Sequence, residues 1–143
     1  MRRRYFLLII LLAGLLGTAI PVPAQSEKQF DIRIILKKKV YKVGEALQGN
    51  ISITNRLPVT VPVSFEARMY KNGKREYSNV ISVKTFLPGQ LSFKFRSFMI
   101  SEEPFKYTDK GNWEIFIKKL NTNEDNATRV PFRVVSQDDP PKP

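Results

Sequence analysis

Residues 59–70 read Val-Thr-Val-Pro-Val-Ser-Phe-Glu-Ala-Arg-Met-Tyr, and this stretch decides the fold class. Every odd position carries an apolar side chain, and the even positions between them are mostly polar. Because successive side chains of a strand point to opposite faces, this period of two predicts a strand with one apolar and one polar face. Such strands are typical of antiparallel sheets that bury one face only.

The same alternation recurs on both sides of this stretch, in residues 30–36, 47–54, 91–96, 113–118 and 129–134. Residues that favour turns separate the segments, at 43–45, 55–58, 72–73, 88–89, 110–111 and 121–126. A spacing of roughly 8–12 residues between turns is typical of a β-sandwich. The sequence therefore predicts one all-β domain over residues 30–135, an antiparallel sandwich of about seven strands.

The turn at residues 72–73 allows two registers for the strand that follows it. A two-residue loop pairs Phe65 with Val80 and leaves Ile81 facing outward. A three-residue loop sets Val63 opposite Ile81 and buries both. Because a shift of one residue moves a whole set of side chains to the other face, we expect the three-residue loop.

The stretch 109–115, Asp-Lys-Gly-Asn-Trp-Glu-Ile, resembles the D-x-G-x-Y-x-C motif that opens strand F of immunoglobulin domains. Trp113 stands in place of the family's tyrosine, and Ile115 stands in place of its second cysteine. Tryptophan has no hydroxyl, so we do not expect the hydrogen bond of the tyrosine corner to be carried over. The resemblance implies an immunoglobulin-like sandwich whose structural core contains Trp113, Ile115, Ile51 and Ile53.

Residues 40–45, Val-Tyr-Lys-Val-Gly-Glu, and the strand after them also resemble bacterial immunoglobulin-like modules. These modules are of the adhesion-linked and macroglobulin-like kinds. One fold of this type hosts many functions, so the resemblance predicts a fold and leaves the function open.

The first 24 residues have the order of a secretory signal peptide. Three arginines at residues 2–4 precede a charge-free apolar stretch, and the small residues Val22 and Ala24 follow it. We expect cleavage after Ala24, with Ala19 as a weaker second site. The apolar stretch is shorter than the ~20 residues of a membrane-spanning helix, so an uncleaved anchor is the less favoured alternative.

The absence of cysteine bounds both the chemistry and the compartment of the chain. Disulfides, thiolate catalysis and thiolate metal sites are excluded. An exported domain without disulfides suits a bacterial envelope, so we expect a periplasmic, cell-surface or secreted protein without stable membrane insertion after cleavage. Residues 25–29 then form an N-terminal extension. Residues 136–143, polar and rich in proline, form a disordered tail.

The chain also has no histidine. This excludes Ser-His-Asp and Cys-His nucleophile systems and histidine-ligated metals. A carboxylate pair among Glu102, Glu103 and Asp109, near Tyr107 and Trp113, is the remaining route to glycoside hydrolysis. The simpler interpretation is a solvated loop and a turn residue. Since no phosphate-binding loop, dinucleotide fingerprint or calcium loop is present, we expect no cofactor, no metal site and no enzyme activity.

The net charge is +11, and it becomes +8 when the three arginines of the signal peptide are removed. Six basic residues form a candidate patch: Lys37, Lys38, Lys39, Lys71, Lys74 and Arg75. Such a charge favours encounters with an anionic polymer of the envelope. The same lysines equally serve to solubilise the surface and to protect sheet edges. An exported chain is not expected to bind nucleic acid.

The hypothesis that these features favour is an exported module that binds or scaffolds a protein through its loops or edge strands. A small proteinase inhibitor is an alternative, because residues 86–90, Phe-Leu-Pro-Gly-Gln, resemble a turn of small bacterial inhibitors. A carbohydrate-binding domain is another, if the aromatic residues outside the alternation gather in the open, namely Phe98, Phe105, Tyr107 and Phe116. Asn50 and Asn126 begin glycosylation sequons, which matter only in a host that uses them.

Overall fold

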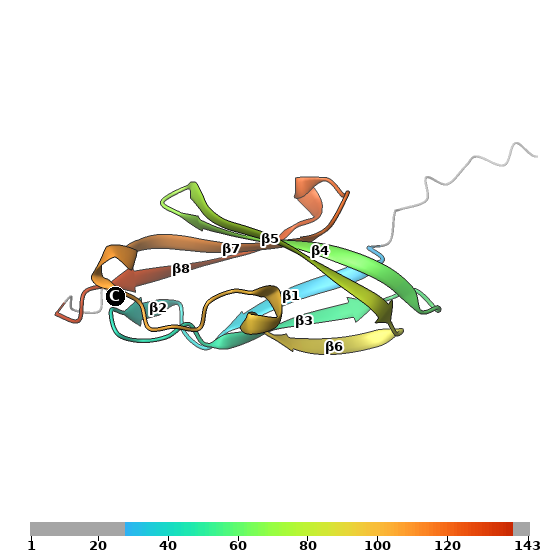
Figure 1. The fold of residues 1–143 in the computed structure, drawn as a ribbon, viewed down its shortest axis with the longest axis horizontal. Helices are drawn as coiled ribbons and strands as arrows, with labels where there is room; N and C mark the ends of the chain where they lie inside the picture. The colour runs from blue at the N-terminus through green and yellow to red at the C-terminus, as the bar shows by residue number, and fades with distance from the viewer. Residues whose placement is uncertain (1–27, 139–143) are drawn as a thin grey trace, which may run out of the picture.

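The computed structural model describes residues 28–138. The predicted signal peptide lies outside these residues, as do residues 25–27 of the extension and 139–143 of the tail. Eight strands form two sheets that lie one above the other (Figure 1), and within the described residues the only helices are short 3-10 turns. The prediction of an all-β sandwich is confirmed.

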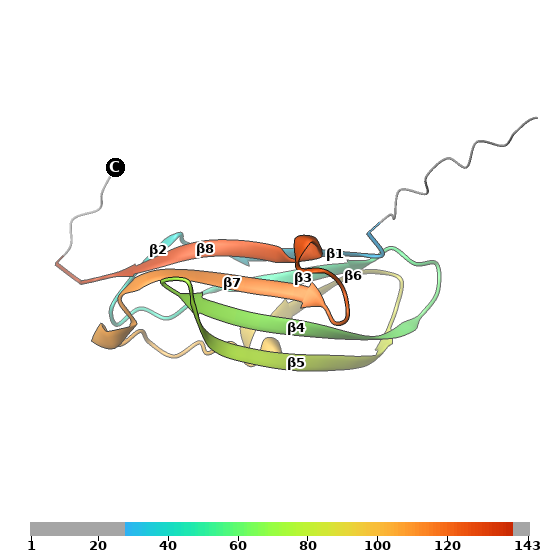
Figure 2. The ribbon, with the colours of Figure 1, turned by 90° about the horizontal axis from the view of Figure 1, so that it is seen from above.

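The smaller sheet has three antiparallel strands in the order β1-β3-β6. These strands are β1 (Phe30–Leu36), β3 (Gly49–Asn55) and β6 (Gly89–Lys94). The larger sheet has five strands in the order β2-β8-β7-β4-β5, which lie side by side in Figure 2. They are β2 (Val40–Lys42), β8 (Thr128–Val135), β7 (Gly111–Lys119), β4 (Val61–Lys71) and β5 (Lys74–Phe86).

This order agrees with the immunoglobulin resemblance. In immunoglobulin domains strand F lies between strands G and C, and variable-type domains add a further strand beside C. The resembling stretch 109–115 runs into β7, which lies between β8 and β4, and β5 is the added strand. There are eight strands instead of the expected seven, because the chain leaves the smaller sheet after β1 and enters the larger one as β2. There β2 pairs in parallel with β8.

The core lies between the inward faces of the two sheets. Ile51, Ile53, Ile115 and Phe65 are fully buried there. Burial of one such side chain contributes about 1.5–3 kcal/mol. Trp113 corrects the expectation of a central core residue, since it is only half buried and stacks on Phe132 with ring centroids 6.1 Å apart. A position near the beginning of β7 puts its ring at the rim of the core.

The β4–β5 hairpin corrects the predicted register. Lys71 pairs with Lys74, so the loop has two residues, and both have positive φ: 49° at Asn72 and 81° at Gly73. Positive φ at both central positions is the geometry of a type I′ turn, for which Asn-Gly is the preferred sequence.

A β-bulge, which the sequence pattern did not reveal, restores the inward direction of the apolar side chains. Tyr70 pairs with Arg75 but Met69 pairs with Tyr77, so Glu76 is the extra residue. From there the register sets Phe65 opposite Ile81, and Ile81 packs against the core. The prediction that Ile81 faces inward was right. The three-residue loop was wrong, because a two-residue loop and the bulge at Glu76 give that direction instead.

A second bulge lies at the other end of β5. Lys84 and Thr85 both stand opposite Pro62, because Val63 pairs with Val83 while Val61 pairs with Phe86. Proline cannot donate a hydrogen bond to the ladder, and a bulge is where a central strand tolerates it. The regular part of β5 is therefore the segment 77–83 between the two bulges.

Candidate functional site

Among the strands of residues 28–138, the longest edge strand is β5, with 13 residues. Within this range β4 is its only neighbour in the sheet. No backbone–backbone hydrogen bond outside the β4–β5 ladder involves β5 within residues 28–138. Alternate residues of such a strand direct their N–H and C=O groups to the open side. The regular segment, Tyr-Ser-Asn-Val-Ile-Ser-Val at 77–83, contains no charge, no proline and no glycine.

A buried asparagine fixes the C-terminal end of β5. Asn55 is only 2% exposed, and its amide nitrogen donates to the carbonyl oxygens of Phe86 at 3.1 Å and Val59 at 3.2 Å. Its side-chain oxygen accepts from the Leu57 N–H at 2.9 Å. Since Asn55 ends β3, these hydrogen bonds join the two sheets at the point where β5 ends.

The N-terminal end of β5 is fixed at the hairpin turn. The Asn72 N–H donates to the Asn112 carbonyl at 2.7 Å, and the Asn112 N–H donates to Asn72 Oδ1 at 2.9 Å. A Cβ atom at Gly111 would lie 2.9 Å from the same oxygen, so a glycine is needed where the two turns meet. Lys71 Nζ donates to the carbonyl of Thr108.

Aromatic side chains pack against the inner side of β5. The 3-10 turn η2 (Phe95–Phe98) closes the sandwich beneath it, and Phe98 is buried there against Phe65. The Tyr77 hydroxyl donates to the Phe98 carbonyl at 3.3 Å, and burial raises the pKa of Tyr77. Contacts thus hold both ends and the inner side of β5, and its outer edge is open.

Side chains of the sheet itself cover the area around Phe116 on the outer face of the five-stranded sheet. Phe116 points outward from β7 yet is fully buried, because the guanidinium groups of Arg68 and Arg129 lie 4.9 Å and 4.6 Å from the centroid of its ring. Arg68 also bonds Glu66 at 2.7 Å and Glu124 at 2.6 Å. Glu124 reaches this face from the 3-10 turn η4 (Glu124–Asn126).

Three further ion pairs complete this outer network: Arg129 with Glu114 at 2.8 Å and with Glu124 at 3.6 Å, and Lys118 with Glu66 at 3.8 Å. The hydrogen bonds from Arg68 hold the pKa values of Glu66 and Glu124 below the ordinary glutamate range. Three carboxylates thus offset three cations over the middle of the sheet. A face whose charges are satisfied internally offers little to an ionic ligand.

Trp113 forms the corner hydrogen bond that the sequence led us not to expect. Its indole Nε1 donates to the Asp109 carbonyl, four residues earlier, at 2.7 Å. The corner needs a donor that reaches the upstream backbone, and an indole N–H supplies one as a phenol does. The Asp109 carboxylate accepts from the Lys106 N–H at 2.6 Å and so caps the 3-10 turn η3 (Tyr107–Asp109).

Those contacts show what the candidate carboxylates do. Asp109 holds its own turn, and Glu102 and Glu103 lie exposed on the connection between η2 and η3. Residues 28–138 contain no group of three or more acidic side chains arranged to hold a metal ion. In the structure Asp109 is a turn residue, and Glu102 and Glu103 are solvent-exposed loop residues.

The four aromatic residues outside the alternation do not gather in the open. Phe98 is in the core, and Phe105 packs on Tyr41 with ring centroids 5.7 Å apart. Phe116 lies under the two arginines, which leaves Tyr107 as the exposed member of the four. This distribution does not make the flat aromatic row that stacks on sugars.

The six residues of the candidate basic patch fall into two groups. Lys37, Lys38 and Lys39 precede β2, whereas the other three lie at the hairpin turn that leads into β5. β2 and β5 are opposite edges of the sheet, four strand spacings apart, or roughly 19 Å. That exceeds the Debye length of ~10 Å at 0.1 M salt, and Lys38 is already paired with Glu45 at 2.8 Å.

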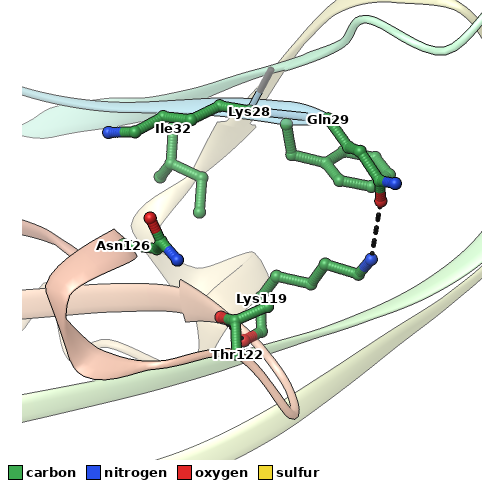
Figure 3. Close-up of a pocket in the computed structure, with 7 residues that line it drawn as sticks. Lys28, Gln29, Ile32, Lys119, Thr122 and Asn126 are labelled. Carbon is green, nitrogen blue, oxygen red and sulfur yellow. Dashed lines mark hydrogen bonds between the residues drawn. The ribbon is translucent and has the colours of Figure 1, made fainter. Parts of the chain in front are cut away.

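A small open cavity of about 180 Å³ lies between the beginning of β1 and the β7–β8 connection (Figure 3). Phe30 and Ile32 supply its apolar wall, and the polar groups around it belong to Lys28, Gln29, Lys119, Thr122 and Asn126. Lys119 Nζ donates to Gln29 Oε1 at 3.0 Å and lies 5.3 Å from the centroid of the Phe30 ring. The ammonium group of Lys119 at this cavity is therefore already engaged by the protein's own side chains.

The turn that resembles proteinase inhibitors is short. Only Leu87 and Pro88 separate β5 from β6, and Gly89 takes the positive φ of 103° that completes the reversal. Leu87 is 57% exposed, but two residues do not form a projecting loop.

Among the described residues, no helix has the length and apolar character needed to cross a bilayer.

Comparison with known proteins supports the fold alone. No protein-family model matches the chain, and no curated protein matches its sequence. Among solved structures, a cycloisomaltooligosaccharide glucanotransferase from Paenibacillus superimposes with a TM-score of 0.51 at 15% identity, over 74% of this chain and 14% of that one. Alkylpurine DNA glycosylase AlkC from Pseudomonas fluorescens matches at 13% identity and a TM-score of 0.49, over 74% and 30%. The chain thus spans less than a third of the length of these enzymes.

Proposed function

We propose that this chain is an exported, non-catalytic module of the cell envelope that binds a protein partner through the open edge of β5. The observation that carries the proposal is the regular segment 77–83, which offers unpaired backbone groups along an edge without charge or proline. Main-chain hydrogen bonds to an added strand supply affinity in this mode of recognition, and side chains supply specificity.

The contacts that hold β5 at its ends and on its inner side support the proposal. A partner segment that adds to a fixed strand loses its own conformational freedom, but the template loses little, and preorganisation raises affinity by lowering this cost. The hydrogen bonds of Asn55 and Asn72 at the two ends and the packing of η2 beneath provide such a template.

Export is the second part of the proposal, and it rests on the order of the first 24 residues. N-terminal sequencing of the protein from a cell fraction should give Gln25 as the first residue. Retention of the arginines at 2–4 would indicate an anchored protein and would overturn the predicted compartment.

Site-specific photo-crosslinking tests the binding edge. A photoreactive residue at position 80 on β5 should capture a protein partner in intact cells, whereas the same residue at position 40 on β2 should not. The two valines are matched controls, since Val80 is 49% and Val40 51% exposed on opposite edges of one sheet. Equal capture at both positions, or capture at position 40 alone, would contradict the proposal.

A further inference from the structure

We infer that the partner which the β5 edge fits best is a second copy of this chain, paired antiparallel about a two-fold axis at Val80. This inference rests on the proposed function, because it names an occupant for the same edge. A two-fold contact uses one patch twice, so the patch must be complementary to itself. The segment between the two bulges meets this condition.

The charges of β5 are self-complementary about Val80. In antiparallel pairing centred there, Glu76 stands opposite Lys84 of the other copy, and Lys84 stands opposite Glu76. Both residues are exposed. Opposite charges in directly facing positions stabilise a strand pair, and like charges destabilise it. The dimer therefore gains two ion pairs, one at each end of the paired segment.

Other registers lose this complementarity. A shift by two residues in one direction sets Lys84 against Lys74, and a shift in the other direction sets Glu76 against Phe86. The register about Val80 also sets Ser78 opposite Ser82, two small exposed side chains that let the backbones approach. Register is specified where only one alignment satisfies the side chains.

The bulges give the pairing its length. Both lie immediately outside 77–83, so the regular strand is centred on Val80 and extends for roughly 23 Å at ~3.3 Å per residue. Bulges interrupt a ladder, so each should end the regular backbone pairing with the second copy, and Glu76 and Lys84 then stand in the first position beyond each end. A contact this short buries less than the ~1,200 Å² of a standard interface, and the dimer should be weak and dependent on concentration.

Sedimentation velocity of the purified chain over a range of concentrations tests this inference. We expect a reversible monomer–dimer equilibrium. Glu76→Lys and Lys84→Glu should each weaken the dimer about tenfold, because each turns two attractive contacts into repulsive ones. The double variant Glu76→Lys/Lys84→Glu restores opposite charges and should return the dimer to within about threefold of the original.

Val80→Lys places two like charges at the axis and should abolish the dimer, whereas Val40→Lys on the opposite edge should leave it unchanged. Circular dichroism of each variant shows whether it is folded. A chain that stays monomeric at all concentrations would overturn the inference, as would a dimer that the charge exchange does not restore. If the monomer still captures a different protein through position 80, the inference fails but the proposed function stands; if position 80 captures nothing, both fail.

Discussion

The two edge strands of the five-stranded sheet both expose unpaired backbone groups, but they differ in how far they are protected from pairing with another strand. The β2 edge has three residues, three lysines precede it and Lys42 ends it, and a turn follows. The β5 edge has 13 residues with an uncharged centre. Natural sheets usually protect their edges with short strands, lysine, proline or bulges. β2 is short and has lysines next to it, whereas β5 has bulges only at its ends.

This difference indicates which edge is available for pairing. An unprotected edge promotes aggregation unless it has a partner, so the central segment of β5 is the exception that a function would explain. The side chains that hold β5 at its ends fix the template and leave its middle open. The experiments that follow test first the supports of this edge and then the edge itself.

Loss of the Asn55 side chain should have the largest effect on stability. Asn55→Ala leaves the carbonyl groups of Phe86 and Val59 without their side-chain partner at a buried site, at a cost of about 2–3 kcal/mol in the free energy of unfolding. Urea denaturation measures this. Asn123→Ala is the matched control, because Asn123 is exposed and makes no side-chain cap. Equal losses in both variants would mean that Asn55 does not hold the end of β5.

Trp113→Phe should have the next largest effect, a loss of about 1 kcal/mol. Phenylalanine keeps the stacking on Phe132 but cannot donate to the Asp109 carbonyl. Chemical denaturation followed by far-ultraviolet circular dichroism gives the value without relying on the lost fluorophore. Tyr107→Phe, at an exposed residue of the same turn, should change stability little. A loss above about 3 kcal/mol would mean that Trp113 contributes to stability as a central core residue does.

Acid should weaken the protein partly through Glu66. Its folded pKa lies below the ordinary value of 4.5, because Arg68 bonds the carboxylate. The stability that Glu66 contributes is therefore present above pH 4.5 and is lost as the pH falls through the folded pKa. Glu66→Gln should flatten the acid side of a plot of unfolding free energy against pH.

Glu103→Gln is the control for that acid test, since the Glu103 carboxylate makes no ion pair within residues 28–138. It should leave the acid side unchanged. A Glu66→Gln profile parallel to that of the parent would show that the network over Phe116 contributes nothing to the pH dependence.

The smallest effect on stability is expected at the two edges themselves. Val80→Lys and Val40→Lys replace half-exposed valines, and each should change the free energy of unfolding by less than about 0.5 kcal/mol. Thermal unfolding of dilute, monomeric samples measures this. If Val80→Lys alone lost several kcal/mol, the valine would support the fold, and the open edge would not be a binding surface.

The alternation of residues 59–70 and the turn signals were enough to predict the sandwich, but the position of the strand that begins in the stretch 109–115, between β8 and β4, came only from the structure. The hairpin register was predicted less well. Asn72-Gly73 signals a two-residue turn, but no residue pattern signalled the bulge at Glu76. A bulge is decided by packing on both sides of a strand, and an alternation read along one strand cannot contain that information.

The sequence by itself determined the all-β fold and excluded cysteine and histidine chemistry, because side-chain period and composition are local properties. Only the tertiary structure decided which strands are edges, that the lysines divide between two of them, and that Phe116 is buried under arginines on an outward face. It also decided that an indole replaces a phenol at the corner. Strand order depends on contacts between residues far apart in the chain, and a local sequence pattern does not show which of these contacts form.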